Sequence, residues 1–421
     1  MANRVEGSIK PPGDKSISHR ALMLAAISDG ECEIEYLSSG RDIESTAECL
    51  RNLGVKIFSK NGKHYISGLG FRNFKAPENI LDCGNSGTTL RLLTGLLAAS
   101  NIETGLDGDD SLRRRPIKRV IEPLNNMGAD IEASDGNDRC PVRIHGVRLK
   151  GVSQILDVPS AQVKTAVLIA GLLAEGVTKL TGLVNTRDHT ERILSYLDVD
   201  IKTDYGVITL KPPENIRKFD IRVPADPSSA AFPIVAALLS LDSELIVSNL
   251  LLNPGRIGYL RILRSMGAQI NIINEIIQYG ETTGEIVIKS SFIKGIDVKA
   301  SEAPSYIDEA PILALAATQA DGQSVFRGLY ELRHKESDRL KNITMIINGM
   351  GGKAVIDNDD LVIDGPSKLR YYEGDCYGDH RLAMMIEVGN IISSGTMSEK
   401  YNDIVGVSFK GFYDTMKGVL I

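Results

Sequence analysis

The sequence predicts a mixed α/β protein of two domains, each built from three similar units. One observation is a polar loop followed by a helix of small apolar residues, which recurs at intervals of 68 to 77 residues; its markers are Ser16, Ser86, Ser160, Ser228, Ser305 and Gly378. A second is a helix-ending signal in register with the first, at 53–55, 127–129, 197–199, 266–268 and 350–352. Six units are therefore expected.

Within the units, helical spacing gives way to a period of two. Residues 55–58, 130–133 and 285–288 alternate in the way that strands do, so each unit is expected to run helix, strand, helix, strand, strand. Units of ~70 residues are larger than solenoid repeats, which favours packing in threes around common cores. The Pro-marked segment 223–227 is the expected boundary between the two domains.

Composition excludes several classes of protein. With 43% hydrophobic and 24% charged residues, the 421-residue chain has the make-up of a globular protein. Lys and Arg number 48 against 54 Asp and Glu, so the net charge of -6 argues against a broad nucleic-acid or membrane surface. An anionic partner must therefore meet a local cluster of cations. The absence of Trp also argues against a base-stacking surface.

The five cysteines show no CxxC pair and no zinc-ligand spacing, so we expect unpaired thiols and no metal. The first ten residues lack an apolar segment, and the apolar run 21–27 is too short to span a bilayer. We therefore expect a cytoplasmic protein.

The loop at 11–20 has the outline of an anion site. It places Lys15, Ser16 and Arg20 at the start of a helix, where free N–H groups and cations favour a phosphate or carboxylate. A Walker A motif is excluded because Asp14 interrupts the Gly-Lys-Ser sequence that it requires. An ordinary capped helix is the alternative interpretation.

Two further loops, 82–91 and 159–165, repeat this design, and Gly87 would let backbone approach a ligand closely. The run Arg113–Arg115 fits either a nucleic-acid patch or a small-anion site. Because the chain is acidic and the run lacks neighbouring aromatics, we favour a small-anion role for at least one of these arginines. Asp188 and His189 are interpreted as a local pair rather than a catalytic dyad.

In the second half, Asp308 and Glu309 directly precede an apolar helix, which Asp308 could cap. The densest charge run is 331–339. If it is helical, Lys335 and Arg339 share a face, although a solvated helix with internal salt bridges is the alternative.

Gly378–Arg381 opens the sixth helix, and Lys410 follows it. If the units form two threefold domains, the basic loop-to-helix joints can face one another. Carboxylates among those cations, Asp308 and Glu336, could then exchange protons with a substrate.

Eight motifs in this order resemble the 5-enolpyruvylshikimate-3-phosphate synthase family: PGDKSISHR, GNSGTTLR, RRRP, SAQVKTA, RDHTE, IDEAP, LRHKESDR and GDHR. The resemblance implies two domains, 14–223 and 1–13 plus 224–421, each of three βαβαββ units in an inside-out α/β barrel, with the active site in the cleft between them. It implies transfer of the enolpyruvyl group of phosphoenolpyruvate to the 5-hydroxyl of shikimate 3-phosphate. It also implies no cofactor, a monomer, and no nucleic-acid or membrane partner.

The resemblance further implies site residues. Shikimate 3-phosphate contacts are expected at Lys15, Ser16, Arg20, Ser160, Ala161, Gln162, Arg187, Asp308, Glu331 and Lys335. Phosphoenolpyruvate contacts are expected at Lys15, Gly87, Arg115, Gln162, Arg339, Arg381 and Lys410. The expected catalytic residues are Lys15, Asp308 as acceptor of the hydroxyl proton, and Glu336 as the group that helps to protonate the methylene carbon; His380 is a further proton-relay candidate.

Three rival functions remain at this stage. The sister enolpyruvyl transferase that acts on UDP-N-acetylglucosamine carries a Cys in the loop before its Arg-Pro motif, and Gly108–Arg115 has none. A non-catalytic anion-binding protein, or an RNA-binding module using Arg113–Arg115, would not require carboxylates among the basic joints. Gly87 also predicts sensitivity to glyphosate, the family's inhibitor at the phosphoenolpyruvate site.

Overall fold

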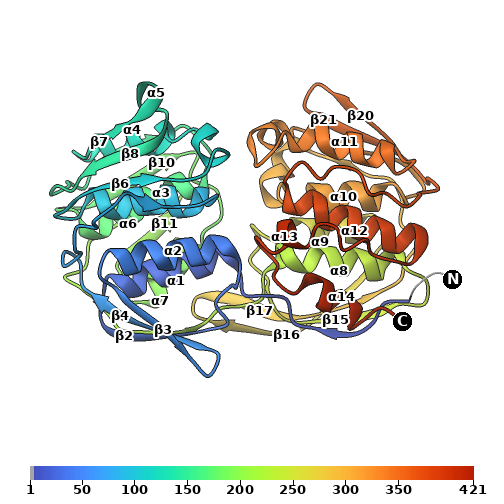
Figure 1. Ribbon diagram of the computed structural model, residues 1–421, viewed down its shortest axis with the longest axis horizontal. Helices are drawn as coiled ribbons and strands as arrows, with labels where there is room; N and C mark the ends of the chain where they lie inside the picture. Colours follow the sequence, from blue (N-terminus) through green and yellow to red (C-terminus); the bar gives the residue numbers. More distant parts are fainter. Residues whose placement is uncertain (1–3) are drawn as a thin grey trace. The chain divides into compact units, whose positions relative to one another are not determined.

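The computed structural model describes residues 4–421 (Figure 1). The chain divides into two compact units. Unit 1 comprises the residues up to Pro12, Pro224–Gln278 and Thr282–Ile421, whereas unit 2 comprises Gly13–Val223 together with Tyr279–Glu281. The predicted mixed α/β class is confirmed, because helices alternate with the strands of five sheets.

Unit 2 contains three sheets that share one strand order. In each, a parallel pair of strands is extended by an antiparallel hairpin whose second strand lies inside. The sheets are β5 (Leu81–Asp82), β6 (Glu103–Asp107), β8 (Arg139–His145), β7 (Asp130–Ala133); β9 (Ser153–Leu156), β10 (Thr178–Gly182), β12 (Val207–Leu210), β11 (Ile201–Asp204); and β13 (Ile216–Arg217), β2 (Ser28–Glu35), β4 (Lys63–Leu69), β3 (Lys56–Lys60), with β14 (Asp220–Arg222) also beside β2.

The core of unit 2 is helical. The three helices that follow the polar loops, α1 (Lys15–Ala26), α3 (Gly87–Ala98) and α6 (Ala161–Leu173), are buried over most of their length. Gly95 of α3 lies against Ala166 of α6, and a Cβ at Gly95 would be 2.3 Å from the Ala166 carbonyl oxygen. The small residues therefore set how closely these helices pack. The other helices of this unit are α2 (Arg41–Asn52), α4 (Lys118–Asn126), α5 (Ser134–Asn137) and α7 (His189–Tyr196), with a 3-10 turn, η1 (Leu112–Arg114).

Unit 1 repeats the arrangement in two sheets with the same strand order. Its core helices are α8 (Pro227–Leu239), α10 (Ala310–Ala317) and α12 (His380–Ser394), which contact one another. Figure 1 shows the three helices within unit 1. The sheets are β1 (Glu6–Ile9), β15 (Glu244–Leu251), β17 (Glu281–Lys289), β16 (Gln269–Gln278); and β18 (Asp297–Val298), β19 (Gly322–Phe326), β21 (Asp360–Gly365), β20 (Lys353–Asp357). The remaining elements are α9 (Gly258–Ser265), η2 (Ala300–Ser305), η3 (Tyr330–His334), α11 (Arg339–Gly349), α13 (Asn402–Val405) and α14 (Phe412–Lys417).

The sixth unit differs from the expected pattern. After β21, the described chain forms α12, α13 and α14 but no strand. No alternating run of strand length follows Gly395, and Tyr401, Phe409 and Phe412 are instead buried against the core of unit 1. The expectation of strands in all six units was therefore wrong for the last one.

The helix-ending signal that recurs in the sequence has a common backbone cause. Its central residues, Gly54, Gly128, Asp198, Gly267 and Gly351, all adopt positive φ directly after a helix. This left-handed conformation is the usual way in which a helix ends before the chain turns back as a strand.

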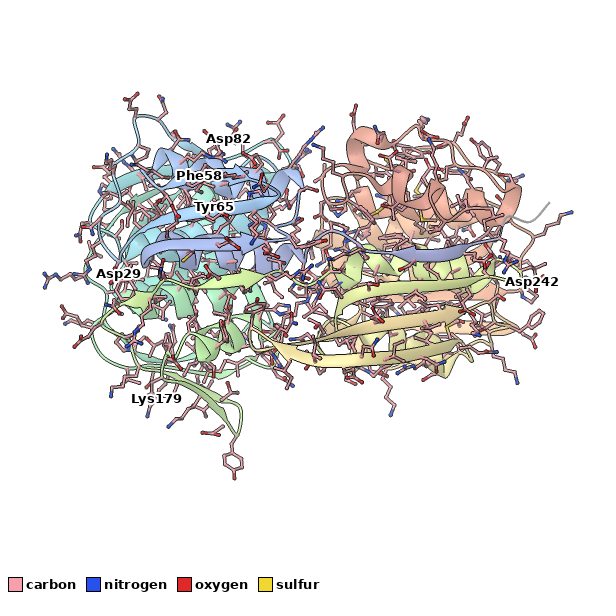
Figure 2. All side chains as sticks on the ribbon, turned by 90° about the horizontal axis from the view of Figure 1, so that it is seen from below. Asp29, Phe58, Tyr65, Asp82, Lys179 and Asp242 are labelled. Atoms are coloured by element: carbon pink, nitrogen blue, oxygen red, sulfur yellow. The ribbon has the colours of Figure 1, made fainter. Side chains whose placement is uncertain are left out.

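The predicted strands are also present. The run 55–58 enters β3, where Phe58 stacks on Tyr65 of β4 at a ring-centroid distance of 5.1 Å (Figure 2). The run 130–133 is β7, and 285–288 lies within β17. The period-two pattern therefore predicted these three strands correctly.

Candidate active site

In unit 2, the N-terminal turns of the three core helices converge. Each helix has a side-chain cap: Asp14 accepts from the N–H of Ile17, Ser86 from Thr89 and Ser160 from Val163. The Arg20 side chain of α1 reaches α6, and the Gln162 side chain of α6 reaches α3. Three helix N-termini, each with partial positive charge, therefore lie together.

Lys15 and Arg20 are both held in place by partners within unit 2. Lys15 forms an ion pair with Asp42 at the start of α2. Arg20 donates from Nε to Thr190 Oγ1 at 2.8 Å, from Nη2 to Thr165 Oγ1 at 2.6 Å, and from Nη1 to the Ser16 carbonyl at 2.7 Å. The predicted cationic loop of α1 is thus pre-formed.

His19, on α1 between these cations, is buried beside Thr46, with 2.7 Å from Nδ1 to Thr46 Oγ1. Burial, and then the charge of Lys15, lower the pKa of His19 to about 3. Its ring is therefore neutral near pH 7, and the positive charge at this helix start comes from Lys15 and Arg20.

The loop at Gly87 and the start of α6 are joined by Arg91, which is buried. Arg91 Nη1 donates to Gln162 Oε1 at 2.8 Å, and Gln162 Nε2 donates to Thr88 Oγ1 at 2.9 Å. Arg91 Nη2 also donates to the Pro116 carbonyl at 3.1 Å. Two predicted contacts of phosphoenolpyruvate, Gly87 and Gln162, are therefore brought together.

The arginine run 113–115 divides into two roles. Arg115 turns toward the Gly87 loop and donates from Nη2 to Asn85 Oδ1 at 2.6 Å. Arg113 is exposed and forms a two-point ion pair with Asp107, at 3.0 and 2.7 Å. The hydrogen bonding of Arg113 to the Asp107 carboxylate lowers the pKa of Asp107. Arg115 is thus the member of the run that joins the cluster.

The other predicted substrate contacts of unit 2 lie at the starts of helices or in the loops before them. Ser16 and Ala161 are the second and first residues of α1 and α6, and Arg187 is partly buried in the loop before α7. His189 Nδ1 lies 2.6 Å from Glu281 Oε1, and Asp188 pairs with Arg192 at 2.8 Å. Asp188 and His189 thus each have a further partner, and their interpretation as a local pair stays a prediction.

In unit 1, Arg339 is the centre of an acidic and basic cluster. Its side chain is 1% exposed, and it donates from Nε to Asp379 Oδ2 at 2.8 Å and from Nη2 to Glu336 Oε2 at 2.5 Å. Burial by itself would lower the pKa of Arg339, but the carboxylates of Asp379 and Glu336 raise it by more. Arg339 is therefore a permanent buried cation.

Asp308 is bordered by three predicted cations. Its Oδ1 lies 3.4 Å from Lys335 Nζ and 3.8 Å from Arg339 Nη1, and its carbonyl accepts from Arg381 Nη1 at 2.9 Å. The residue at the N-cap of α10 is Glu309, so the proposal that Asp308 caps this helix was wrong. The Asp308 carboxylate faces the cations instead.

The charge run 331–339 is not one helix. Tyr330–His334 forms η3, and α11 begins only at Arg339 because Asp338 caps it by accepting from the Lys341 N–H at 3.1 Å. The expectation that Lys335 and Arg339 share a helix face is thus wrong. Asp308 brings the two side chains together, while Glu336 contacts Arg339 directly.

The remaining predicted residues of unit 1 are more dispersed. His380 is buried at the start of α12, whereas Glu331 is exposed in η3. Lys410 is exposed between α13 and α14, and within residues 4–421 no contact brings its side chain into the Arg339 cluster.

Sequence reasoning assigned no role to three residues that organise these clusters: Asp42, Arg91 and Asp379. Arg91 and Asp379 stand inside the quoted motifs GNSGTTLR and GDHR. The sequence did carry one signal for them. A charged residue at the start of a predicted helix, or within an apolar one, is expected to be buried and to need a partner.

No group of three or more His, Cys, Asp or Glu side chains within 4–421 is placed to hold a metal ion. None of the helices in that range is long and apolar enough to cross a membrane.

Comparison with known proteins gives a consistent result. The family model for EPSP synthase (3-phosphoshikimate 1-carboxyvinyltransferase) matches residues 1–416. The 3-phosphoshikimate 1-carboxyvinyltransferase of Thermodesulfovibrio yellowstonii is 43% identical, with coverage of 99% of this chain and 97% of the relative. That of Roseiflexus castenholzii is 40% identical over the same shares.

Solved structures agree. EPSP synthase from Acinetobacter baumannii is 37% identical with a TM-score of 0.89, covering 100% of this chain and 97% of the other. The enolpyruvyl transferase NikO from Streptomyces tendae has a TM-score of 0.76 at 17% identity, covering 99% and 95%, a likeness that supports the fold alone.

Proposed function

Because the chain belongs to the EPSP synthase family, we propose that it transfers the enolpyruvyl group of phosphoenolpyruvate to the 5-hydroxyl of shikimate 3-phosphate and releases phosphate. Each substrate carries one phosphate and one carboxylate. The observation that supports the assignment best is the carboxylate of Asp308 held between Lys335 and Arg339, because the reaction needs a proton acceptor among cations.

The proposal assigns shikimate 3-phosphate to hydroxyl, amide and basic groups of both units. In unit 2 these are Lys15, Ser16, Arg20, Ser160, Ala161, Gln162 and Arg187, and in unit 1 they are Asp308, Glu331 and Lys335. The capped starts of α1 and α6 support this choice, since a helix N-terminus with nearby cations favours a phosphate.

Phosphoenolpyruvate is assigned to Lys15, Gly87, Arg115 and Gln162 in unit 2 and to Arg339, Arg381 and Lys410 in unit 1. Arg is the residue best suited to grip a planar carboxylate at two points. The fixed guanidinium of Arg339 and the Arg91-bound amide of Gln162 support this assignment, because groups already held in place lose little freedom on binding.

The chemistry proceeds by addition and elimination. Asp308 accepts the proton of the 5-hydroxyl while the hydroxyl oxygen bonds to the central carbon of phosphoenolpyruvate. At the same time a proton is delivered, with help from Glu336, to the methylene carbon. The intermediate carries a methyl group. Loss of one methyl proton and cleavage of the carbon–oxygen bond to phosphate then restore the double bond. Lys15 and the arginines stabilise the departing phosphate, since charge develops there.

We further propose that the enzyme acts as a cytoplasmic monomer on these small molecules, with no nucleic-acid partner. The net charge of -6 and the use of Arg113 in an ion pair with Asp107 support this over an RNA-binding role. A monomer should sediment with the mass of one 45.7 kDa chain.

The direct test supplies phosphoenolpyruvate with one of two acceptors and measures phosphate release. We expect release with shikimate 3-phosphate and background with UDP-N-acetylglucosamine. Release with the nucleotide sugar alone would replace this proposal by the sister activity, and release with neither acceptor would favour a non-catalytic anion-binding protein.

A further inference from the structure

A buried carboxylate, Glu309, stands directly after Asp308 in the chain. Its side chain is fully buried in unit 1, yet it forms no capping hydrogen bond with the helix that it precedes, α10. A buried carboxylate is costly unless charges or hydrogen bonds compensate it. Its position therefore calls for partners outside the helix.

Glu309 is fixed by a residue of α8. Ser228 Oγ donates to Glu309 Oε1, and Ser228 in turn accepts from Arg256 Nη2 at 3.0 Å. Arg256 Nη2 also donates to Asp226 Oδ1 at 2.9 Å. All four residues are buried. This network anchors the carboxylate to the core of unit 1.

The same oxygen of Glu309 also faces the proposed site. Glu309 Oε1 lies 3.6 Å from Arg381 Nη1, and this nitrogen donates to the Asp308 carbonyl at 2.9 Å. Arg381 is thus held between the Glu309 carboxylate and the backbone of Asp308. Its remaining guanidinium nitrogens are the groups available to grip an anion.

The surroundings strengthen this interaction. Burial, and then the carboxylates of Glu309 and Asp226, raise the pKa of the nearby Tyr259 hydroxyl, which is fully buried. Charges act strongly on one another in such a low-polarity environment. The Glu309 charge therefore has a larger effect on Arg381 than a surface carboxylate would have.

We infer that Glu309 is a positioning residue: its charge orients Arg381 toward phosphoenolpyruvate and, through Arg381, steadies the backbone of Asp308. The inference rests on the proposed function of this site. It makes a specific claim, since the loss of the Glu309 charge should affect phosphoenolpyruvate more than shikimate 3-phosphate.

The test is Glu309→Gln, which keeps the size and the oxygen that accepts from Ser228 but removes the charge facing Arg381. We expect the KM for phosphoenolpyruvate to rise about tenfold, the effect of one close charge interaction in a partly buried site, with the KM for shikimate 3-phosphate within twofold of wild type. Glu309→Asp should restore part of the loss. Ser228→Ala, which frees the carboxylate, should change the same KM in the same direction but less.

Glu387→Gln is the matched control. Glu387 is equally buried, lies on α12 with Arg381, and accepts from Tyr413 Oη at 2.9 Å and from Ser398. It should lower the melting temperature and leave both KM values unchanged.

Equal changes of the two KM values in Glu309→Gln, or a lower melting temperature with neither KM changed, would overturn the inference. If Glu309→Gln does not fold, an unchanged phosphoenolpyruvate KM in Ser228→Ala overturns it. Wild-type enzyme run in parallel separates the two proposals. No phosphate from wild type refutes the proposed function, whereas active wild type with an unaffected variant refutes this inference alone.

Discussion

Arg339 and Asp379 form a two-point ion pair in the interior of unit 1, with 2.8 Å from Nε to Oδ2 and 3.2 Å from Nη2 to Oδ1. Asp379 also caps α12 by accepting from the Arg381 N–H at 2.9 Å. One carboxylate therefore fixes the plane of Arg339 and the start of the helix that carries Arg381. The arrangement leaves Arg339 Nη1 facing Asp308.

Asp379→Asn should remove the charge that compensates Arg339. We expect a loss of about 3 kcal/mol in the free energy of unfolding, because a buried cation is left without its main partner. The KM for phosphoenolpyruvate should rise as well. Denaturant unfolding and steady-state kinetics measure the two effects.

Asp297→Asn is the control for Asp379→Asn. Asp297 makes the same two-point contact with Arg327, at 2.7 and 2.6 Å, but on the surface. Its removal should leave the unfolding midpoint and the kinetics unchanged, since exposed ion pairs contribute little. Equal losses in both variants would contradict the role given to burial.

Asp308→Ala should separate binding from chemistry. Without its proton acceptor, turnover should fall by roughly 10²–10⁴-fold, the usual contribution of general acid–base catalysis. Shikimate 3-phosphate should still bind measurably by calorimetry, since other groups hold its phosphate. Unchanged turnover would reject the catalytic assignment of Asp308.

Gly87→Ala should weaken phosphoenolpyruvate binding. The added Cβ would lie 2.6 Å from Arg91 Nη1 and 3.5 Å from Arg115 Nη1, so Arg91 must shift and loosen its hold on Gln162. We expect a rise in the phosphoenolpyruvate KM and weaker inhibition by glyphosate. Gly418→Ala, whose Cβ would meet only ordinary contacts at 3.4 Å or more, is the control. Wild-type enzyme that resists millimolar glyphosate would contradict the predicted sensitivity.

His19 predicts a specific loss of stability in acid. The pKa of His19 is about 3 in the folded protein against an ordinary value of 6.5, so the fold favours the neutral ring. The associated stability is complete above pH 6.5 and is lost as the pH falls, because the unfolded chain then binds a proton that the folded chain does not.

The variant His19→Gln should therefore lose less stability between about pH 6.5 and 3. The difference in slope can reach about 1.4 kcal/mol per pH unit, the value for one proton. Urea unfolding at stepped pH measures it, and parallel slopes for wild type and variant would contradict the burial of a neutral His19.

Local patterns predicted the helices and sheets well, because their causes lie within short stretches of chain. The positive-φ ends at Gly54 and Gly267 are one example, and the alternation at 130–133 is another. The failures concern contacts between distant residues. Nothing near Arg91 in the sequence indicates that it will bind Gln162, which is 71 positions away.

The charge run 331–339 shows the same limit. Helical spacing placed Lys335 and Arg339 on one helix face, but Asp338 caps a helix that begins only at Arg339, so Lys335 lies outside it. The two cations are brought together by Asp308 instead. Likewise, Asp308 and Glu309 look equivalent in sequence. Only their contacts in the fold distinguish them. The Asp308 carboxylate faces Lys335 and Arg339. The Glu309 carboxylate is buried and contacts Ser228 and Arg381.

The most direct test of the proposed transfer is mass spectrometry of the product formed from phosphoenolpyruvate and shikimate 3-phosphate in D₂O. The account predicts a product in which an enolpyruvyl group replaces the hydroxyl hydrogen of the acceptor, with deuterium in its methylene group, because the intermediate passes through a methyl group. Pyruvate with unchanged acceptor, or an adduct free of deuterium, would contradict it.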